Sequence, residues 1–139
     1  MRIHRTTWLL LALFAAACKK EGAPPAAAAA PPALSPNIGP QSEAALRDPR
    51  AQIFLTKGCP QCHAISELQV TSPTNSGPDL ALAWTDVRSR FSLPLDSFLH
   101  NPTGTMQIVL GSMIKLSPAE RDSIVKLLHE INEAKTHHQ

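Results

Sequence analysis

The run Cys59-Pro60-Gln61-Cys62-His63 constrains this chain more than any other stretch of its sequence. Two thiols three positions apart on a helical turn can each add across a vinyl group of a haem, and the histidine that follows then lies under the iron. The pattern is typical of a haem held by two thioether bonds. The sequence therefore predicts one covalent haem c, attached through both cysteines, with His63 as an iron ligand.

Two other chemistries use the same residue types. A C-x-x-C pair beside a βαβ unit indicates a dithiol redox site, but no run of β-branched residues flanks this one. Zinc could also be held by Cys59, Cys62 and His63. A closed structural zinc site needs four ligands, however, and the adjacent Cys62 and His63 make an awkward pair. Both alternatives stay open, and haem is favoured.

The N-terminus has the pattern of an export signal over residues 1–17. Arg2 and Arg5 precede the apolar run 8–14, which is too short to span a bilayer comfortably, and small residues follow. The sequence Ala15-Ala16-Ala17-Cys18 resembles a bacterial lipobox, with alanine at position 15 where leucine is usual. The resemblance implies cleavage before Cys18 and acylation of its thiol and amino group. An uncleaved anchor or plain secretion are the alternatives.

The cysteine count agrees with this interpretation. Three cysteines would leave one free thiol in an oxidising compartment, but lipid on Cys18 and haem on Cys59 and Cys62 use all three. The expected location is therefore the periplasmic side of a bacterial membrane, where Cys18 is the lipid anchor. Lys19 stands where an inner-membrane retention signal would have aspartate, which favours the outer membrane.

Residues 18–41 are dominated by alanine and proline and predict a flexible tether. About twenty such residues would reach roughly 60 to 70 Å when extended. Residues 42–139 remain for a single domain of about one hundred residues. From Ser42 onward there are 9 lysines and arginines against 10 aspartates and glutamates, so the domain is near neutral and its charge does not support a nucleic-acid partner.

The spacing of caps and apolar residues predicts helices throughout this domain, and no strand. The first helix is expected over 49–57, with Asp48 as its N-cap, Pro49 at its first position and Gly58 at its end. Another turn or two should cover 64–70, before a loop at 71–78. Short helices are expected over 82–88 and 95–100.

The last helix has the strongest local signals. Ser117 is expected to cap it, Pro118 to take the first helical position, and Glu120 to complete a capping box. Its apolar residues fall on one stripe, which predicts a face packed against the domain. The stripe comprises Ile124, Leu127, Leu128 and Ile131.

The order of these parts over residues 42–134 resembles a class I c-type cytochrome. The resemblance implies an all-α fold, a small cytochrome c-like bundle of about four to five helices around one covalently bound haem. It also implies that the Pro78 carbonyl accepts the second ring N–H of His63, and that a methionine holds the other face of the iron. Met106 follows Pro102 and a Gly-Thr pair, as the family's ligand does, whereas Met113 is close to the Ser117 cap. Met106 is therefore preferred, and the residues after it should wall the haem edge: Ile108, Val109, Leu110, Ile114 and Leu116.

The resulting hypothesis is an outer-sphere electron carrier. It is not an enzyme, because an iron with two protein ligands leaves no open position and no carboxylate pair or nucleophile constellation occurs elsewhere in the sequence. Its partners would be a redox protein donor and acceptor. The rival hypothesis is a gas-binding or sensor haem domain with a vacant or weak sixth position. His100 is a further, less favoured candidate for that position.

Overall fold

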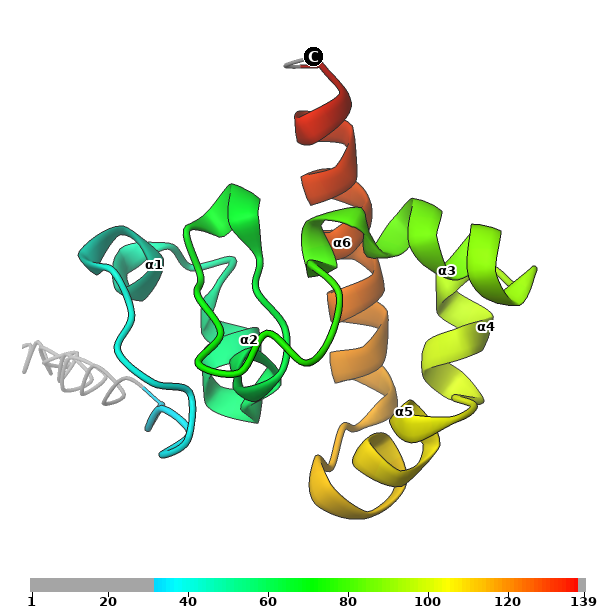
Figure 1. Ribbon diagram of the computed structural model, residues 1–139, viewed down its shortest axis with the longest axis horizontal. Coiled ribbons are helices and arrows are strands. Elements are labelled where there is room, and N and C mark those ends of the chain that lie inside the picture. The colour runs from blue at the N-terminus through cyan, green and yellow to red at the C-terminus, as the bar shows by residue number, and fades with distance from the viewer. Residues whose placement is uncertain (1–31, 138–139) are drawn as a thin grey trace, which may run out of the picture. The chain divides into compact units, whose positions relative to one another are not determined.

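The structure is a computed structural model that describes residues 32–137. The export signal at residues 1–17 and Cys18 lie outside the described residues. Within residues 32–137 the chain forms a small all-α domain without strands, as predicted; one isolated bridge joins Ile65 and Val70 (Figure 1). Across that range, no helix combines the length and apolarity that crossing a membrane requires.

The described part contains six α-helices, three 3-10 turns and one π-helical turn. The α-helices are α1 (Glu43–Arg47), α2 (Gln52–Lys57), α3 (Ala83–Phe91), α4 (Leu95–His100), α5 (Thr105–Ile108) and α6 (Pro118–His137). The 3-10 turns are η1 (Cys59–Gln61), η2 (Ser66–Leu68) and η3 (Leu80–Leu82), and η4 (Val109–Met113) is a π-helical turn.

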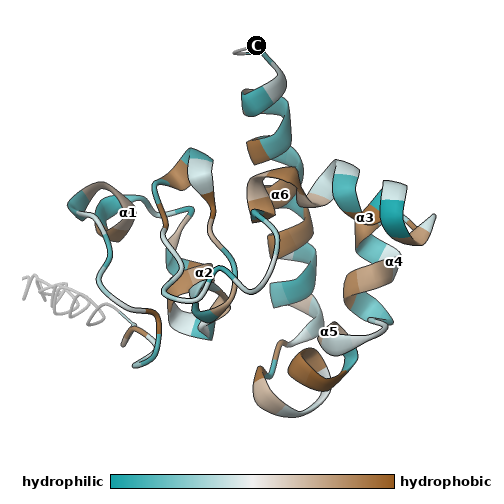
Figure 2. Cartoon of the chain, in the orientation of Figure 1, coloured by the Kyte–Doolittle hydropathy of each residue, from teal (hydrophilic) through white to brown (hydrophobic). Residues whose placement is uncertain are grey.

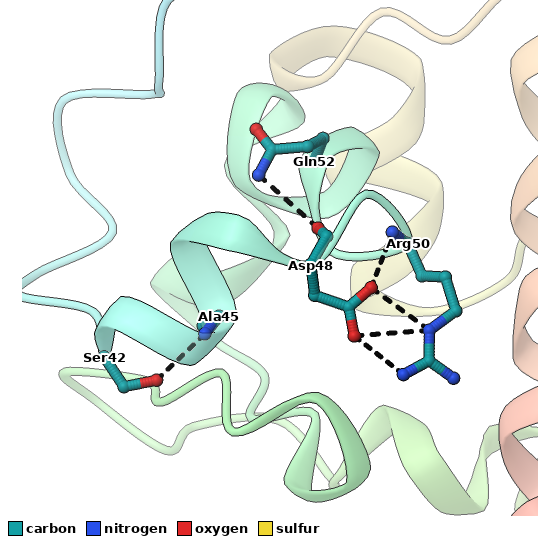
Figure 3. Close-up of polar contacts among 5 residues, drawn as sticks. All are labelled: Ser42, Ala45, Asp48, Arg50 and Gln52. Carbon is teal, nitrogen blue, oxygen red and sulfur yellow. Dashed lines mark hydrogen bonds and ion pairs between the residues drawn. The ribbon is translucent and has the colours of Figure 1, made fainter.

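The first predicted helix begins later than expected, and the prediction that Asp48 is its N-cap is wrong. The Asp48 carboxylate accepts a hydrogen bond from the backbone N–H of Arg50 at 2.8 Å and bonds from its guanidinium at 2.7 to 3.2 Å (Figure 3). The side-chain hydrogen bond from Arg50 is the main reason that the pKa of Asp48 lies below its usual value. Because Arg50 occupies the carboxylate, α2 begins at Gln52 without a side-chain cap.

A short helix before α2 was not predicted. Ser42 caps α1 by accepting a hydrogen bond from the Ala45 N–H at 3.1 Å (Figure 3). The chain before α1 also packs on the domain, since Ile38 is only 4% exposed and the Ser35 N–H donates to the Leu55 carbonyl at 3.1 Å. Residues 35–41, assigned to the tether by composition, thus contribute to the core.

The end of α2 is as predicted and delivers the chain to the cysteine motif. Gly58 caps the helix with φ of 78°, a left-handed conformation that glycine adopts without steric cost. Phe54 and Leu55 of α2 are fully buried. The first cysteine therefore starts a 3-10 turn at a fixed point beside the core.

Helix α6 confirms its predicted start. The Glu120 N–H donates to Ser117 Oγ at 3.2 Å, and the Ser117 N–H donates to Glu120 Oε2 at 2.8 Å, which is a capping box. Apolar residues recur along α6 (Figure 2), which packs against α3, α4 and η3. Ile124, Leu128 and Ile131 are buried, and Leu127 is half-buried.

The middle of the domain follows the prediction with two differences. Helix α4 has the predicted bounds, whereas α3 runs on to Phe91. No helix was predicted around Met106, but this segment forms α5 and η4. Met106 is thus held on a helical turn.

Candidate functional site

His63 is oriented by the loop that follows it. Its Nδ1 lies 2.7 Å from the carbonyl oxygen of Pro78, the contact that the family resemblance implies. Because a carbonyl can only accept, this hydrogen bond places the proton on Nδ1. The lone pair on Nε2 is then free to bind a metal, and the ring orientation is fixed.

Gly77 lets the loop approach the imidazole. A Cβ at this position would lie 2.8 Å from Nε2 of His63 and closer still to Cε1 and Nδ1. The Gly77 N–H donates to the Cys62 carbonyl at 2.8 Å, so the loop is also tied to the cysteine motif by its backbone. The family resemblance implied Pro78 as the partner of His63, but the need for glycine at position 77 is visible only from the packed ring.

Asp79, which follows Pro78 in the chain, holds the loop that contains Gly77 and Pro78. Its Oδ1 accepts hydrogen bonds from the N–H groups of Ser66 at 3.1 Å and Ala81 at 2.9 Å, and Lys135 Nζ lies 3.8 Å from Oδ2. Burial acts to raise the pKa of Asp79, but these hydrogen bonds and the Lys135 charge outweigh it, and the pKa is lowered. Asp79 therefore stays ionised and holds Pro78 in place. The sequence analysis did not assign it this role.

His63 and Met106 line one pocket of about 260 Å³. This volume is just below the roughly 300 to 1,000 Å³ of common ligand pockets, so a group of haem size would widen it or protrude from it. Most of the lining is apolar, and its charged members Asp86 and Arg90 form an ion pair at 3.5 Å. The apolar wall consists of Leu80, Ala83, Val87, Phe91, Leu95, Phe98, Leu99 and Leu128.

The two candidate methionines lie in different environments. Met106 is half-buried in the pocket, whereas Met113 lies outside it and is 67% exposed. Met113, the candidate that is not preferred, is therefore no part of the core. The predicted wall from the segment after Met106 is wrong, because Ile108 is 64% exposed and the wall comes from α3, α4 and α6 instead. None of the five predicted wall residues after Met106 lines the pocket.

His100, the alternative sixth ligand, lies in a different environment. Its Nδ1 is 3.2 Å from Asp96 Oδ1, and its Nε2 is 3.6 Å from Asp122 Oδ1 at the exposed surface between α4 and α6. His129 is likewise engaged elsewhere, with its ring centroid 4.2 Å from that of Trp84. Neither histidine contributes to the lining of the pocket.

Cys59 begins the 3-10 turn η1 and Cys62 follows it as the C-cap, and the two form no disulfide with each other. Cys59 is half-buried and packs against the core, while Cys62 is exposed. Desolvation by burial raises the pKa of the Cys59 thiol to about 12. A dithiol redox site uses a thiolate as its nucleophile, so a thiol with a raised pKa is poorly suited to that chemistry.

These residues fit a haem c in their chemistry: His63, with Nε2 free, and the Met106 sulfur line one apolar pocket, and the paired thiols precede His63 in the chain although neither lines the pocket. The fold and the site together define a small all-α domain with a candidate haem site. No protein-family model, curated protein or solved structure matches the chain.

Proposed function

We propose that this protein is a monohaem c-type cytochrome that carries electrons by outer-sphere transfer. The observation that carries the proposal is the shared pocket of His63 and Met106, with the paired thiols of Cys59 and Cys62 beside His63 in the chain. Histidine nitrogen with methionine sulfur is the ligand set of electron-carrying haem c. Because both axial positions would be filled by the protein, an electron carrier is favoured over an enzyme.

Each residue has a defined part in this proposal. The haem would supply the one-electron chemistry. Cys59 and Cys62 would hold it covalently, Pro78 would orient His63 through Nδ1, and Met106 would offer its sulfur from the lining of the same pocket as His63. Methionine sulfur favours ferrous iron, and an apolar lining disfavours the extra charge of ferric iron, so both raise the reduction potential. The partners would be a redox protein donor and a redox protein acceptor.

The test of the proposal is the attachment of the cofactor. Because both thiols would be consumed by vinyl groups, haem should stay with the polypeptide through denaturing electrophoresis and acid-acetone extraction. Cys59→Ser should weaken attachment, leaving one thioether. Complete release of haem from a chain of unmodified mass would contradict the covalent site.

The proposed location depends on Cys18, which lies outside the described residues. We expect a mature protein that begins at Cys18 and partitions with the membrane fraction, since several acyl chains on one residue bind far more firmly than one. Cys18→Ser should move the protein to the soluble fraction, as measured by fractionation and by the mass of the mature N-terminus. A soluble mature protein that starts at another residue would refute the lipid anchor.

A further inference from the structure

The segment that carries Met106 is loosely packed along its length. Added Cβ atoms at Gly104 and Gly111 would meet nothing within 4 Å, and Ile108 and Met113 are 64% and 67% exposed. Leu110 is its buried anchor, at 6% exposure. Segments with few buried contacts open at low free-energy cost. The position of Met106 therefore depends strongly on how the two ends of its segment are held.

The first end is fixed by α4. The Asn101 N–H donates to the Ser97 carbonyl at 2.9 Å, and the Arg121 guanidinium donates to the Leu99 carbonyl. These contacts hold the chain just before the turn that leads to Met106.

The second end is held by one lysine. Lys57 Nζ donates to the Lys115 carbonyl at 3.1 Å and lies 2.7 Å from Glu120 Oε1. The other carboxylate oxygen of Glu120 accepts the Ser117 N–H of the capping box. The Lys57 and Glu120 side chains are 27% and 34% exposed, so solvent and salt screen this pair less than a fully exposed one.

The position of Lys57 in the chain determines which two segments this contact connects. It is the last residue of α2 and is followed directly by Gly58 and Cys59. The Lys57–Glu120 pair, with the Lys115 carbonyl, thus joins the segment that carries Met106 to the start of the motif that carries His63. We refer to this set of contacts as the Lys57 lock.

We propose that Lys57 and Glu120 are positioning residues that hold the Met106 segment closed over the pocket. For the iron ligand this rests on the proposed function, whereas the restraint on the segment does not. Loss of either charge should let the segment open more often, so that a small ligand competes more effectively with the Met106 sulfur. The Lys57 lock acts through the Lys115 carbonyl and the Ser117 N–H, and none of its contacts involves the Met106 side chain.

The ionisation of Glu120 suits a permanent restraint. Its hydrogen bond from the Lys57 side chain, followed by the one from the Ser117 backbone, lowers the pKa of Glu120 from 4.5 to about 2. A lowered folded-state pKa stabilises the native state fully above the unfolded value of 4.5, and this contribution is lost as pH falls towards 2. The lock should therefore be intact throughout the neutral range.

Imidazole binding to the ferric protein provides the first measurement. Lys57→Gln and Glu120→Gln should each raise the imidazole affinity about two- to fivefold, the range expected when a modest ion pair is lost. The double variant should add little to either change, and Lys57→Arg should restore the original affinity. The matched control is Lys126→Gln on α6, whose partner Glu130 lies at 3.9 Å on the exposed surface; it should leave the affinity unchanged.

Hydrogen exchange of the amides of residues 105–114 provides the second measurement and does not depend on the iron. Exchange should be faster in Lys57→Gln than in the unmutated protein, and unchanged in Lys126→Gln. If Lys57→Gln lowers the melting temperature without changing exchange in this segment, the positioning role is overturned and the proposed function stands. If exchange accelerates but the unmutated protein carries no haem, the lock stands and the proposed function fails.

Discussion

Met106→Ala should lower the reduction potential and allow carbon monoxide to bind the ferrous protein. Loss of the sulfur removes a ligand that preferentially stabilises ferrous iron and opens the sixth position. The drop should be a sizeable share of the roughly 0.8 V that axial ligation covers in haem proteins. Potentiometric titration and carbon monoxide difference spectra measure both effects.

Met113→Ala is the matched control for this experiment. Because Met113 is 67% exposed and lies outside the pocket, its removal should change the free energy of unfolding by no more than about 0.5 kcal/mol and leave the potential unaltered. The opposite pattern would transfer the ligand role to Met113 and leave electron transfer standing. Rapid binding of carbon monoxide by the unmutated protein would instead favour the gas-binding hypothesis.

The features that could be predicted from sequence are those with short-range causes. The capping box of Ser117 and Glu120 needs only four consecutive residues, and the glycine cap at Gly58 needs only one. Asp48 was misassigned for an equally local reason: its carboxylate had two possible partners, the N-terminal amides of a helix and the Arg50 side chain. The guanidinium adds charge to the hydrogen bond, and charge-assisted bonds are the stronger ones.

In the candidate site, too, the residues with local causes were predictable from sequence, and those that depend on tertiary packing were not. Cys59, Cys62 and His63 fall within five consecutive residues, and the cytochrome resemblance implied Pro78 as the partner of His63. The pocket wall depends on tertiary packing and could not be read from periodicity. The run after Met106 is apolar, but Ile108 at the end of α5 and Met113 at the end of the π-helical turn are exposed, and Leu110 is the buried residue between them. Helices α3 and α4 supply the wall instead, because their apolar faces pack towards α6.

Gly77→Ala should disrupt the site although it adds a single methyl group. The backbone at Gly77 does not need a positive φ, so alanine is compatible with its conformation. The added Cβ, however, would overlap three atoms of the His63 ring, whose Nδ1 is already held by the Pro78 carbonyl. Either the ring or the loop must move, at a cost of about 1 to 3 kcal/mol for overpacking. The expected results are a lower melting temperature and a reduced ratio of haem to protein in the purified variant.

Gly111→Ala separates this steric effect from the general effect of replacing a glycine. An added Cβ at Gly111 meets open space within the π-helical turn, and alanine is favoured over glycine in helices by about 1 kcal/mol. Gly111→Ala should therefore be neutral or slightly stabilising and should retain its haem. Equal haem content in the two variants would show that the loop at Gly77 can withdraw without disturbing His63, and the close approach would then not be a requirement of the site. Loss of haem in Gly77→Ala alone ties the identity of residue 77 to the orientation of the His63 ring.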